Sequence, residues 1–140
     1  TPMWLMGWAL RSEPNAALRI VNLSSGAATN PYPAWGVYCA SKAALKMAGA
    51  CLDIELGEVP SLAGRDAVVI SYAPGVVDTA MQDAIRSSDP SLFPRRERFV
   101  ALHADGELVP PEGPAGEIAR LLESDDLPRY VEERYAPPGR

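Results

Sequence analysis

The fold is decided by the stretch Ala67-Val68-Val69-Ile70-Ser71-Tyr72-Ala73-Pro74-Gly75. Its first seven residues are mostly apolar and rich in β-branched side chains, which is typical of a strand buried on both faces, as in a parallel sheet. The proline-glycine pair then ends the strand. Residues 17–23 form a second run of the same kind, bounded by turn residues. We therefore expect two buried strands.

A long helical pattern at residues 34–56 lies between these strands and is ended by Pro60 and Gly64. Its high alanine content favours a helix. The order strand, helix, strand, with a crossover of this length, predicts right-handed parallel pairing. The sequence therefore indicates an α/β protein with helices layered on a parallel sheet.

The flanking segments complete a single domain, which we expect to comprise residues 1–140. They contain no internal repeat, long linker or low-complexity tract. Mostly helical segments are expected at residues 3–11, 77–85, 94–105 and 114–124, and a last edge strand at residues 129–132.

Composition excludes several classes of protein. No run of about 18 apolar residues is present, so no membrane span is predicted. The net charge is −5, and basic residues are scattered apart from Arg95, Arg96 and Arg98. A chain without a basic stripe is not expected to bind nucleic acid.

The two cysteines predict a reducing compartment. Cys39 and Cys51 lie in one predicted helix, where twelve residues span about 18 Å, too far for a disulfide. They also lack the spacing of a metal site, so no metal is expected. Free thiols in a chain without an export signal favour the cytoplasm.

Polar residues follow both buried strands and begin the helix between them. Ser24 and Ser25 come directly after the first strand, Tyr38 and Lys42 lie near the start of the helix, and residues 74–79 follow the second strand. Ligands bind at this edge of open α/β sheets, beyond the carboxyl ends of the strands. The sequence therefore predicts one binding site built from all three segments.

Tyr38 and Lys42 are four residues apart, so they share one face of the predicted helix. A nearby cation makes a tyrosine proton easier to transfer, and such a tyrosine can act as a general acid or base on a carbonyl or alcohol oxygen. Alone, the pair also fits a solvated helix face. A hydrolase triad of Ser25 and His103 with an aspartate is rejected, because no Gly-x-Ser-x-Gly turn surrounds Ser25.

Three stretches in order resemble the classical short-chain dehydrogenase/reductase family. They are residues 19–25 (RIVNLSS), residues 38–45 (YCASKAAL), which begin thirteen residues after Ser25, and residues 72–79 (YAPGVVDT). The resemblance covers nearly the whole chain. It implies the carboxyl-terminal half of a Rossmann-like, doubly wound parallel sheet and an NAD(P)-dependent oxidoreductase.

The resemblance also implies roles for named residues. Tyr38 is the general acid or base, Lys42 assists it and holds the nicotinamide ribose, and Ser25 steadies the substrate oxygen. The cofactor-binding residues implied beside Tyr38 and Lys42 are Pro74, Gly75, Val77 and Thr79.

Within the family, residues 35–40 (WGVYCA) and 78–82 (DTAMQ) are similar to the sepiapterin reductase and benzil reductase-like branch. This similarity implies NADP as cofactor, with NAD as the alternative. It also implies that a ketone, diketone or pterin side-chain carbonyl is the small-molecule substrate. Glu132 is a candidate substrate-binding residue, because the branch has an acidic residue near its C-terminus. The alternative for Glu132 is a solvated glutamate on an edge strand.

The family's glycine-rich dinucleotide loop is not found in this sequence. We therefore expect the chain to be a fragment that lacks the N-terminal half and is inactive alone. In the full-length protein the long helix is expected to pack against its copy in a homodimer, through the small residues Ala43, Ala44, Ala48 and Ala50.

Two alternative functions are retained. One is a non-catalytic binding or regulatory member of the same fold, against which the intact set Ser25, Tyr38 and Lys42 argues. The other is an extended-type sugar-nucleotide epimerase or dehydratase, which shares the tyrosine–lysine pair. Residues 74–79 and the short tail favour the classical reductase instead.

Overall fold

The computed structural model describes residues 2–137 and shows an α/β fold. The elements in chain order are α1 (Pro2–Ser12), β1 (Leu18–Leu23), the short 3-10 helix η1 (Gly26–Ala28), α2 (Gly36–Glu58), β2 (Ala67–Ala73), α3 (Ala80–Arg86), α4 (Arg96–Ala104), α5 (Glu112–Leu122) and β3 (Tyr130–Arg134). The predicted strand at residues 67–73 is confirmed at both ends, and the long helix is confirmed with a shift of two residues.

The sheet has three parallel strands in the order β1-β2-β3. Leu18 pairs with Ala67 at the start of β1, and Val69 pairs with Tyr130 at the start of β3. β3 is an edge strand in this sheet, as predicted. Since all strands run the same way, their carboxyl ends meet at one edge of the sheet.

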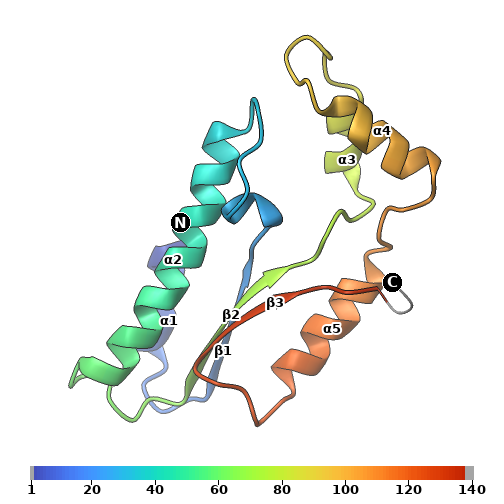
Figure 1. Ribbon diagram of the computed structural model, residues 1–140. Helices are drawn as coiled ribbons and strands as arrows, with labels where there is room; N and C mark the ends of the chain where they lie inside the picture. Colours follow the sequence, from blue (N-terminus) through green and yellow to red (C-terminus); the bar gives the residue numbers. More distant parts are fainter. Residues whose placement is uncertain (1, 138–140) are drawn as a thin grey trace.

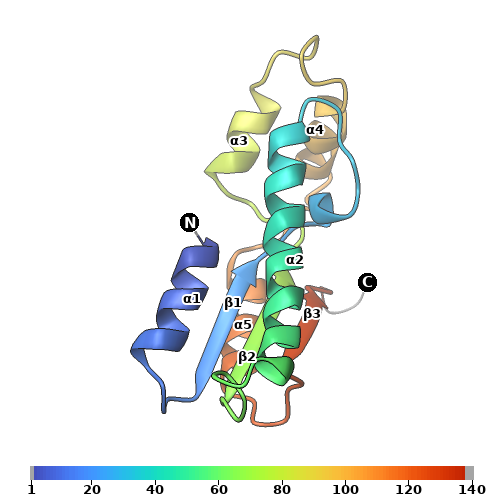
Figure 2. The ribbon, with the colours of Figure 1, turned by 90° about the vertical axis from the view of Figure 1, so that its left-hand side faces the viewer.

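Helices cover both faces of the sheet. α1 and α2 lie side by side on one face and α5 lies on the other, while α3 and α4 extend beyond the carboxyl ends of the strands (Figures 1 and 2). The layering follows from β2, whose alternate residues point to opposite faces of the sheet. The predicted layers of helices on a parallel sheet are therefore confirmed.

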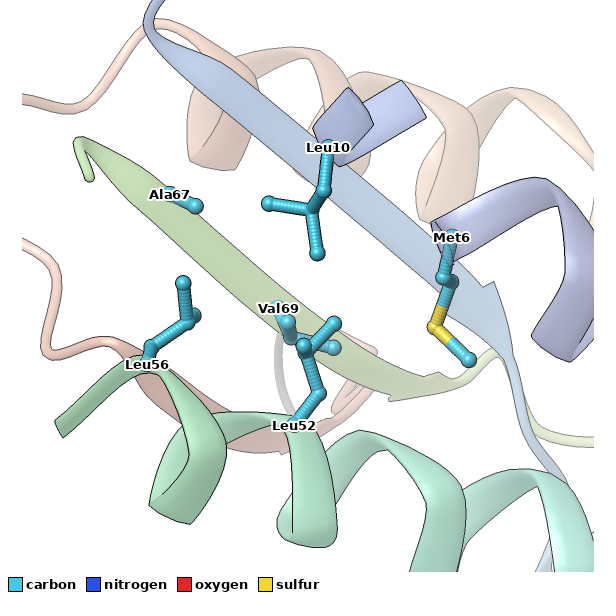
Figure 3. Close-up of a cluster of buried hydrophobic side chains, with 6 residues drawn as sticks. All are labelled: Met6, Leu10, Leu52, Leu56, Ala67 and Val69. Carbon is cyan, nitrogen blue, oxygen red and sulfur yellow. The ribbon is translucent and has the colours of Figure 1, made fainter. Parts of the chain in front are cut away.

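The first core cluster lies between the sheet and the helices α1 and α2 (Figure 3). Val69 of β2 is fully buried there. Met6 and Leu10 come from α1 and Leu52 from α2. Burial of side chains of this size stabilises the fold by about 1.5–3 kcal/mol each, so this cluster holds α2 against the sheet.

The second core cluster lies on the α5 face and contains Val68, Ile70 and Tyr72. Tyr72 is fully buried, and its hydroxyl donates a 2.7 Å hydrogen bond to the carboxylate of Glu117 in α5. Burial, and next the hydrogen bond to Glu117, raise the pKa of Tyr72 far above its usual value. Tyr72 therefore stays protonated and links α5 to β2.

Two sequence predictions need correction. Residues 17–23 were expected to be buried on both faces, but in β1 only Asn22 is buried and Leu23 is exposed, because β1 is the other edge strand of this sheet. A helix was expected from residue 77, but α3 begins at Ala80. Val77 instead forms a parallel β-bridge with Val109, which keeps this part of the loop extended.

Both cysteines are free thiols in α2, in agreement with the sequence: Cys39 is partly buried and Cys51 is exposed. Among residues 2–137, no helix combines the length and the apolar character needed to cross a membrane.

Candidate active site

One cavity of about 260 Å³ lies at the carboxyl ends of β1 and β2. It brings together nearly all the residues that the sequence singled out as a site. Those that line it are Ser25, Tyr38, Lys42, Pro74, Gly75, Val77 and Thr79. The segments that supply them are far apart in the sequence and meet here because the strands run parallel.

Tyr38 and Lys42 lie in the first part of α2, one helical turn apart. The ammonium nitrogen of Lys42 is 5.7 Å from the centroid of the Tyr38 ring. It donates a 2.7 Å hydrogen bond to the backbone carbonyl of Leu23, at the end of β1. The hydroxyl of Tyr38 has no hydrogen-bond partner within residues 2–137, so it is available to a ligand in the cavity.

Ser25 stands between β1 and η1, where its side chain caps the short helix. Its hydroxyl oxygen accepts a 3.2 Å hydrogen bond from the backbone N–H of Ala27. A serine hydroxyl has one proton to donate and two lone pairs to accept with. Because the cap uses a lone pair, the proton of Ser25 remains available to an acceptor in the cavity.

The loop after β2 has the backbone shape that its sequence predicts. Gly75 has a φ of 83°, in the left-handed region where glycine is favoured. Val109 donates to the carbonyl of Val76 and accepts from the N–H of Asp78. In such a parallel bridge the backbone groups of Val77 itself point away from Val109. The carbonyl of Val77 accepts a 3.4 Å hydrogen bond from the Thr79 hydroxyl.

The sequence did not reveal a cluster of aromatic rings beside Tyr38, formed by Trp35, Phe93 and Phe99, which we call the aromatic wall. Trp35 stacks on Phe93 with ring centroids 5.1 Å apart and planes 8° apart. It also makes a T-shaped contact with Tyr38, with ring centroids 5.5 Å apart. Phe99 and Tyr32 also contact Trp35. A second, apolar cavity of about 240 Å³ is lined by Trp35, Tyr38, Met81 and Ile85. The site thus has an apolar, aromatic side next to the Tyr38 ring.

Two arginines of the cavity were also missed. Arg98 in α4 and Arg134 at the end of β3 both line it. Arg98 lies in the one basic cluster that the sequence contains, but nothing in the sequence indicated which cavity it lines.

Glu132 lies outside this cavity. It lines a neighbouring one of about 210 Å³, which shares Ser25 and Arg134 with the first. Its carboxylate forms a 2.8 Å ion pair with Lys46 and accepts a 2.9 Å hydrogen bond from the Tyr130 hydroxyl. Lys46 holds the pKa of Glu132 below its usual value, and burial, together with Glu132, raises the pKa of Tyr130 to about 12. The structure therefore does not bring Glu132 together with Tyr38.

Comparison with known proteins gives a consistent result. The sequence profile of the short chain dehydrogenase family matches residues 3–90. The chain is 40% identical to benzil reductase ((S)-benzoin forming) of Bacillus cereus over 111 residues, which are 79% of this chain and 43% of that protein. It is 40% identical to rat sepiapterin reductase over 119 residues, which are 84% and 41% of the two chains. This chain thus spans about two fifths of the length of these relatives.

A solved structure shows the same similarity in three dimensions. A short-chain dehydrogenase/reductase from Saccharomyces cerevisiae superposes with a TM-score of 0.77 at 30% identity, over 96% of this chain and 52% of that chain. The parallel sheet with helices on both faces is therefore part of a Rossmann-like fold. The matched profile covers more than half of the chain, including Ser25, Tyr38, Lys42 and residues 74–79. We conclude that the chain belongs to the short-chain dehydrogenase/reductase family.

Proposed function

We propose that this chain is the carboxyl-terminal, substrate-binding part of an NADP-dependent carbonyl reductase. One observation carries the proposal: a hydroxyl donor (Ser25), a phenol (Tyr38) and an ammonium group (Lys42) line one cavity beside an aromatic wall. These groups are suited to binding a carbonyl oxygen and supplying it with a proton. The family membership argues for the same chemistry.

The residues of the cavity fit the nicotinamide end of a dinucleotide. The left-handed turn at Gly75 exposes backbone without a side chain to the cavity. The N–H of Val77, which the bridge to Val109 does not use, suits a carboxamide oxygen. Thr79 and Lys42 can hold neighbouring hydroxyl groups. When bound, a reduced nicotinamide supplies the hydride for the carbonyl carbon.

The proton comes from the protein. Tyr38 donates its hydroxyl proton to the carbonyl oxygen, which becomes the alcohol, and the phenolate is later reprotonated from solvent. The Ser25 hydroxyl donates a hydrogen bond to the same oxygen and keeps it in line with Tyr38. The ammonium charge of Lys42 stabilises the phenolate that is left behind.

The apolar side of the cavity supports a substrate with a flat, unsaturated substituent. Trp35 and Phe99 line the cavity there and Phe93 contacts both rings, and aromatic groups favour planar ligands. The names of the relatives agree, since benzil reductase acts on a diaryl diketone and sepiapterin reductase on a pterin. We therefore propose a ketone, a diketone or a pterin side-chain carbonyl as substrate.

The phosphate groups of the cofactor need a site that these 140 residues do not supply, because the glycine-rich loop of dinucleotide-binding folds is not in the sequence. We propose that the remainder of a longer protein provides that loop. The choice of NADP over NAD rests on the similarity to sepiapterin reductase.

We further propose that the whole protein is a homodimer that packs through the outer face of α2. Three large apolar side chains on α2 are exposed: Val37 at 88%, Met47 at 64% and Ile54 at 55%. Ala48, expected from the sequence to lie on the dimer face, packs against the first core cluster instead. Met47→Glu should turn the dimer into a monomer in analytical ultracentrifugation.

Because both thiols are free, we propose that the protein resides in the cytoplasm.

The function is tested by following NADPH and NADH oxidation by the whole protein with benzil, sepiapterin and small diketones. We expect oxidation of NADPH that matches the loss of ketone one to one. A non-catalytic member of the fold would oxidise neither cofactor. An extended-type epimerase would interconvert sugar nucleotides without consuming added NADPH. Either result would overturn the proposal.

A further inference from the structure

The cavity that contains Tyr38 has an unusual charge. The chain carries a net charge of −5, yet three cationic side chains line this cavity and, within residues 2–137, no carboxylate does. The three are Lys42, Arg98 and Arg134. A low-dielectric pocket with charges of one sign attracts ligands of the opposite sign.

Two of these three cations are already bound to the protein. Lys42 donates to the carbonyl of Leu23, and Arg98 lies 3.5 Å from the Tyr32 hydroxyl. Arg134 is different: across residues 2–137 it has neither an ion pair nor a hydrogen bond from its guanidinium group. The neighbouring Glu132 is already paired with Lys46.

Arg134 is also well placed for a substrate. It pairs in register with Ala73, so it lies at the carboxyl end of the sheet beside Pro74. A Cβ atom added to Gly26 would lie 3.3 Å from its Nη1 atom. The guanidinium therefore lies against the backbone next to Ser25, close enough that an alanine at position 26 would crowd it.

We propose that Arg134 binds a carboxylate of the substrate, so that the enzyme prefers ketones bearing an acidic group, such as aryl 2-oxo acids, over their uncharged esters. The inference rests on the proposed function and specifies its substrate class. Arginine suits this role because its planar fork donates two parallel hydrogen bonds to one carboxylate. The aryl group then contacts the aromatic wall, while Ser25 and Tyr38 donate hydrogen bonds to the ketone oxygen.

The test compares phenylglyoxylate with methyl phenylglyoxylate in an NADPH-oxidation assay of the whole protein. The two compounds share the ketone and the ring and differ in charge. Wild-type protein should show the higher kcat/KM with the acid. Arg134→Gln should raise KM for the acid about tenfold to a hundredfold, the range for losing a hydrogen bond between charged groups, and should leave the ester unchanged.

Two further variants and one control sharpen the test. Arg134→Lys should restore part of the preference for the acid, and Gly26→Ala should reduce it slightly by crowding the guanidinium. Arg129→Gln is the matched control: Arg129 forms an ion pair with Asp53 and does not line the cavity, so both substrates should be unaffected.

Four results would overturn the inference. Equal losses on acid and ester in Arg134→Gln would show a structural role only. A raised KM for NADPH in place of the ketone would assign Arg134 to a cofactor phosphate. A wild-type protein that reduces the ester and shows no preference for the acid would leave the reductase function standing and remove the carboxylate subsite. Failure to reduce any ketone would overturn both.

Discussion

Lys42 donates a 2.7 Å hydrogen bond to the backbone carbonyl of Leu23, which ties α2 to the last residue of β1. The hydrogen bond fixes the ammonium group one helical turn from Tyr38 and 5.7 Å from its ring centroid. The same lysine thus holds the helix at the edge of the sheet and supplies a positive charge to the site. Removing it should therefore affect both geometry and chemistry.

Replacing Tyr38 with phenylalanine should lower kcat by about a hundredfold to ten-thousandfold, the usual contribution of a positioned general acid. The ring and its contact with Trp35 remain, so the dissociation constant for NADPH should change little. Stopped-flow turnover and fluorescence titration of the whole protein measure the two effects. Tyr32→Phe is the control: its ring lines the same cavity, and we expect turnover to be kept. Normal turnover by Tyr38→Phe would remove Tyr38 from the mechanism.

Lys42→Met should lower kcat and weaken NADPH binding together, because the charge beside Tyr38 and the hydrogen bond to Leu23 are both lost. Lys42→Arg keeps the charge and should recover part of kcat. Lys46→Met, one turn further along α2, is the matched control because Lys46 pairs with Glu132 outside the cavity. Equal losses of kcat in Lys42→Met and Lys46→Met would contradict the assignment.

Trp35→Leu should raise KM for aryl ketones about three- to tenfold, since an aromatic contact contributes about 0.5–1.5 kcal/mol beyond simple burial. A small aliphatic diketone should be reduced almost as before, because it needs no stacking surface. Trp8→Leu serves as control: Trp8 is 50% exposed on α1, away from the cavity. A uniform loss on all ketones would show that Trp35 only supports the fold.

Glu132 should make stability depend on pH in the acid range. Its ion pair with Lys46 holds the pKa of the folded carboxylate below the usual value of 4.5. The unfolded chain therefore binds more protons in acid, and the stabilisation present above pH 4.5 is lost as the pH falls through the lowered pKa. Thermal melts across the acid range should show a shallower decline for Glu132→Gln than for wild type. Glu133→Gln, the neighbouring control, should follow wild type.

Much of the fold followed from local patterns. β2 was predicted residue by residue because its apolar run has turn residues on both sides, and α2 because its alanine-rich pattern is long. The cluster of Ser25, Tyr38 and Lys42 was also anticipated, since parallel strands bring their carboxyl ends to one edge.

The remainder depends on contacts between distant segments. The delayed start of α3 results from the bridge between Val77 and Val109, which no local pattern reports. The stacking of Trp35 on Phe93 joins residues 58 positions apart, on either side of β2. The pairing of Glu132 with Lys46 likewise needed the β2–β3 register before it could be seen.

The three tryptophans are distributed between two environments, and this gives the protein built-in optical reporters. Trp4 and Trp8 stack on each other on the exposed side of α1, with centroids 6.4 Å apart, whereas Trp35 lines the cavity. In a variant with both α1 indoles replaced by phenylalanine, Trp35 would be the one indole left within these 140 residues. Quenching or a blue shift on titration would then report occupancy of the cavity without any catalytic turnover.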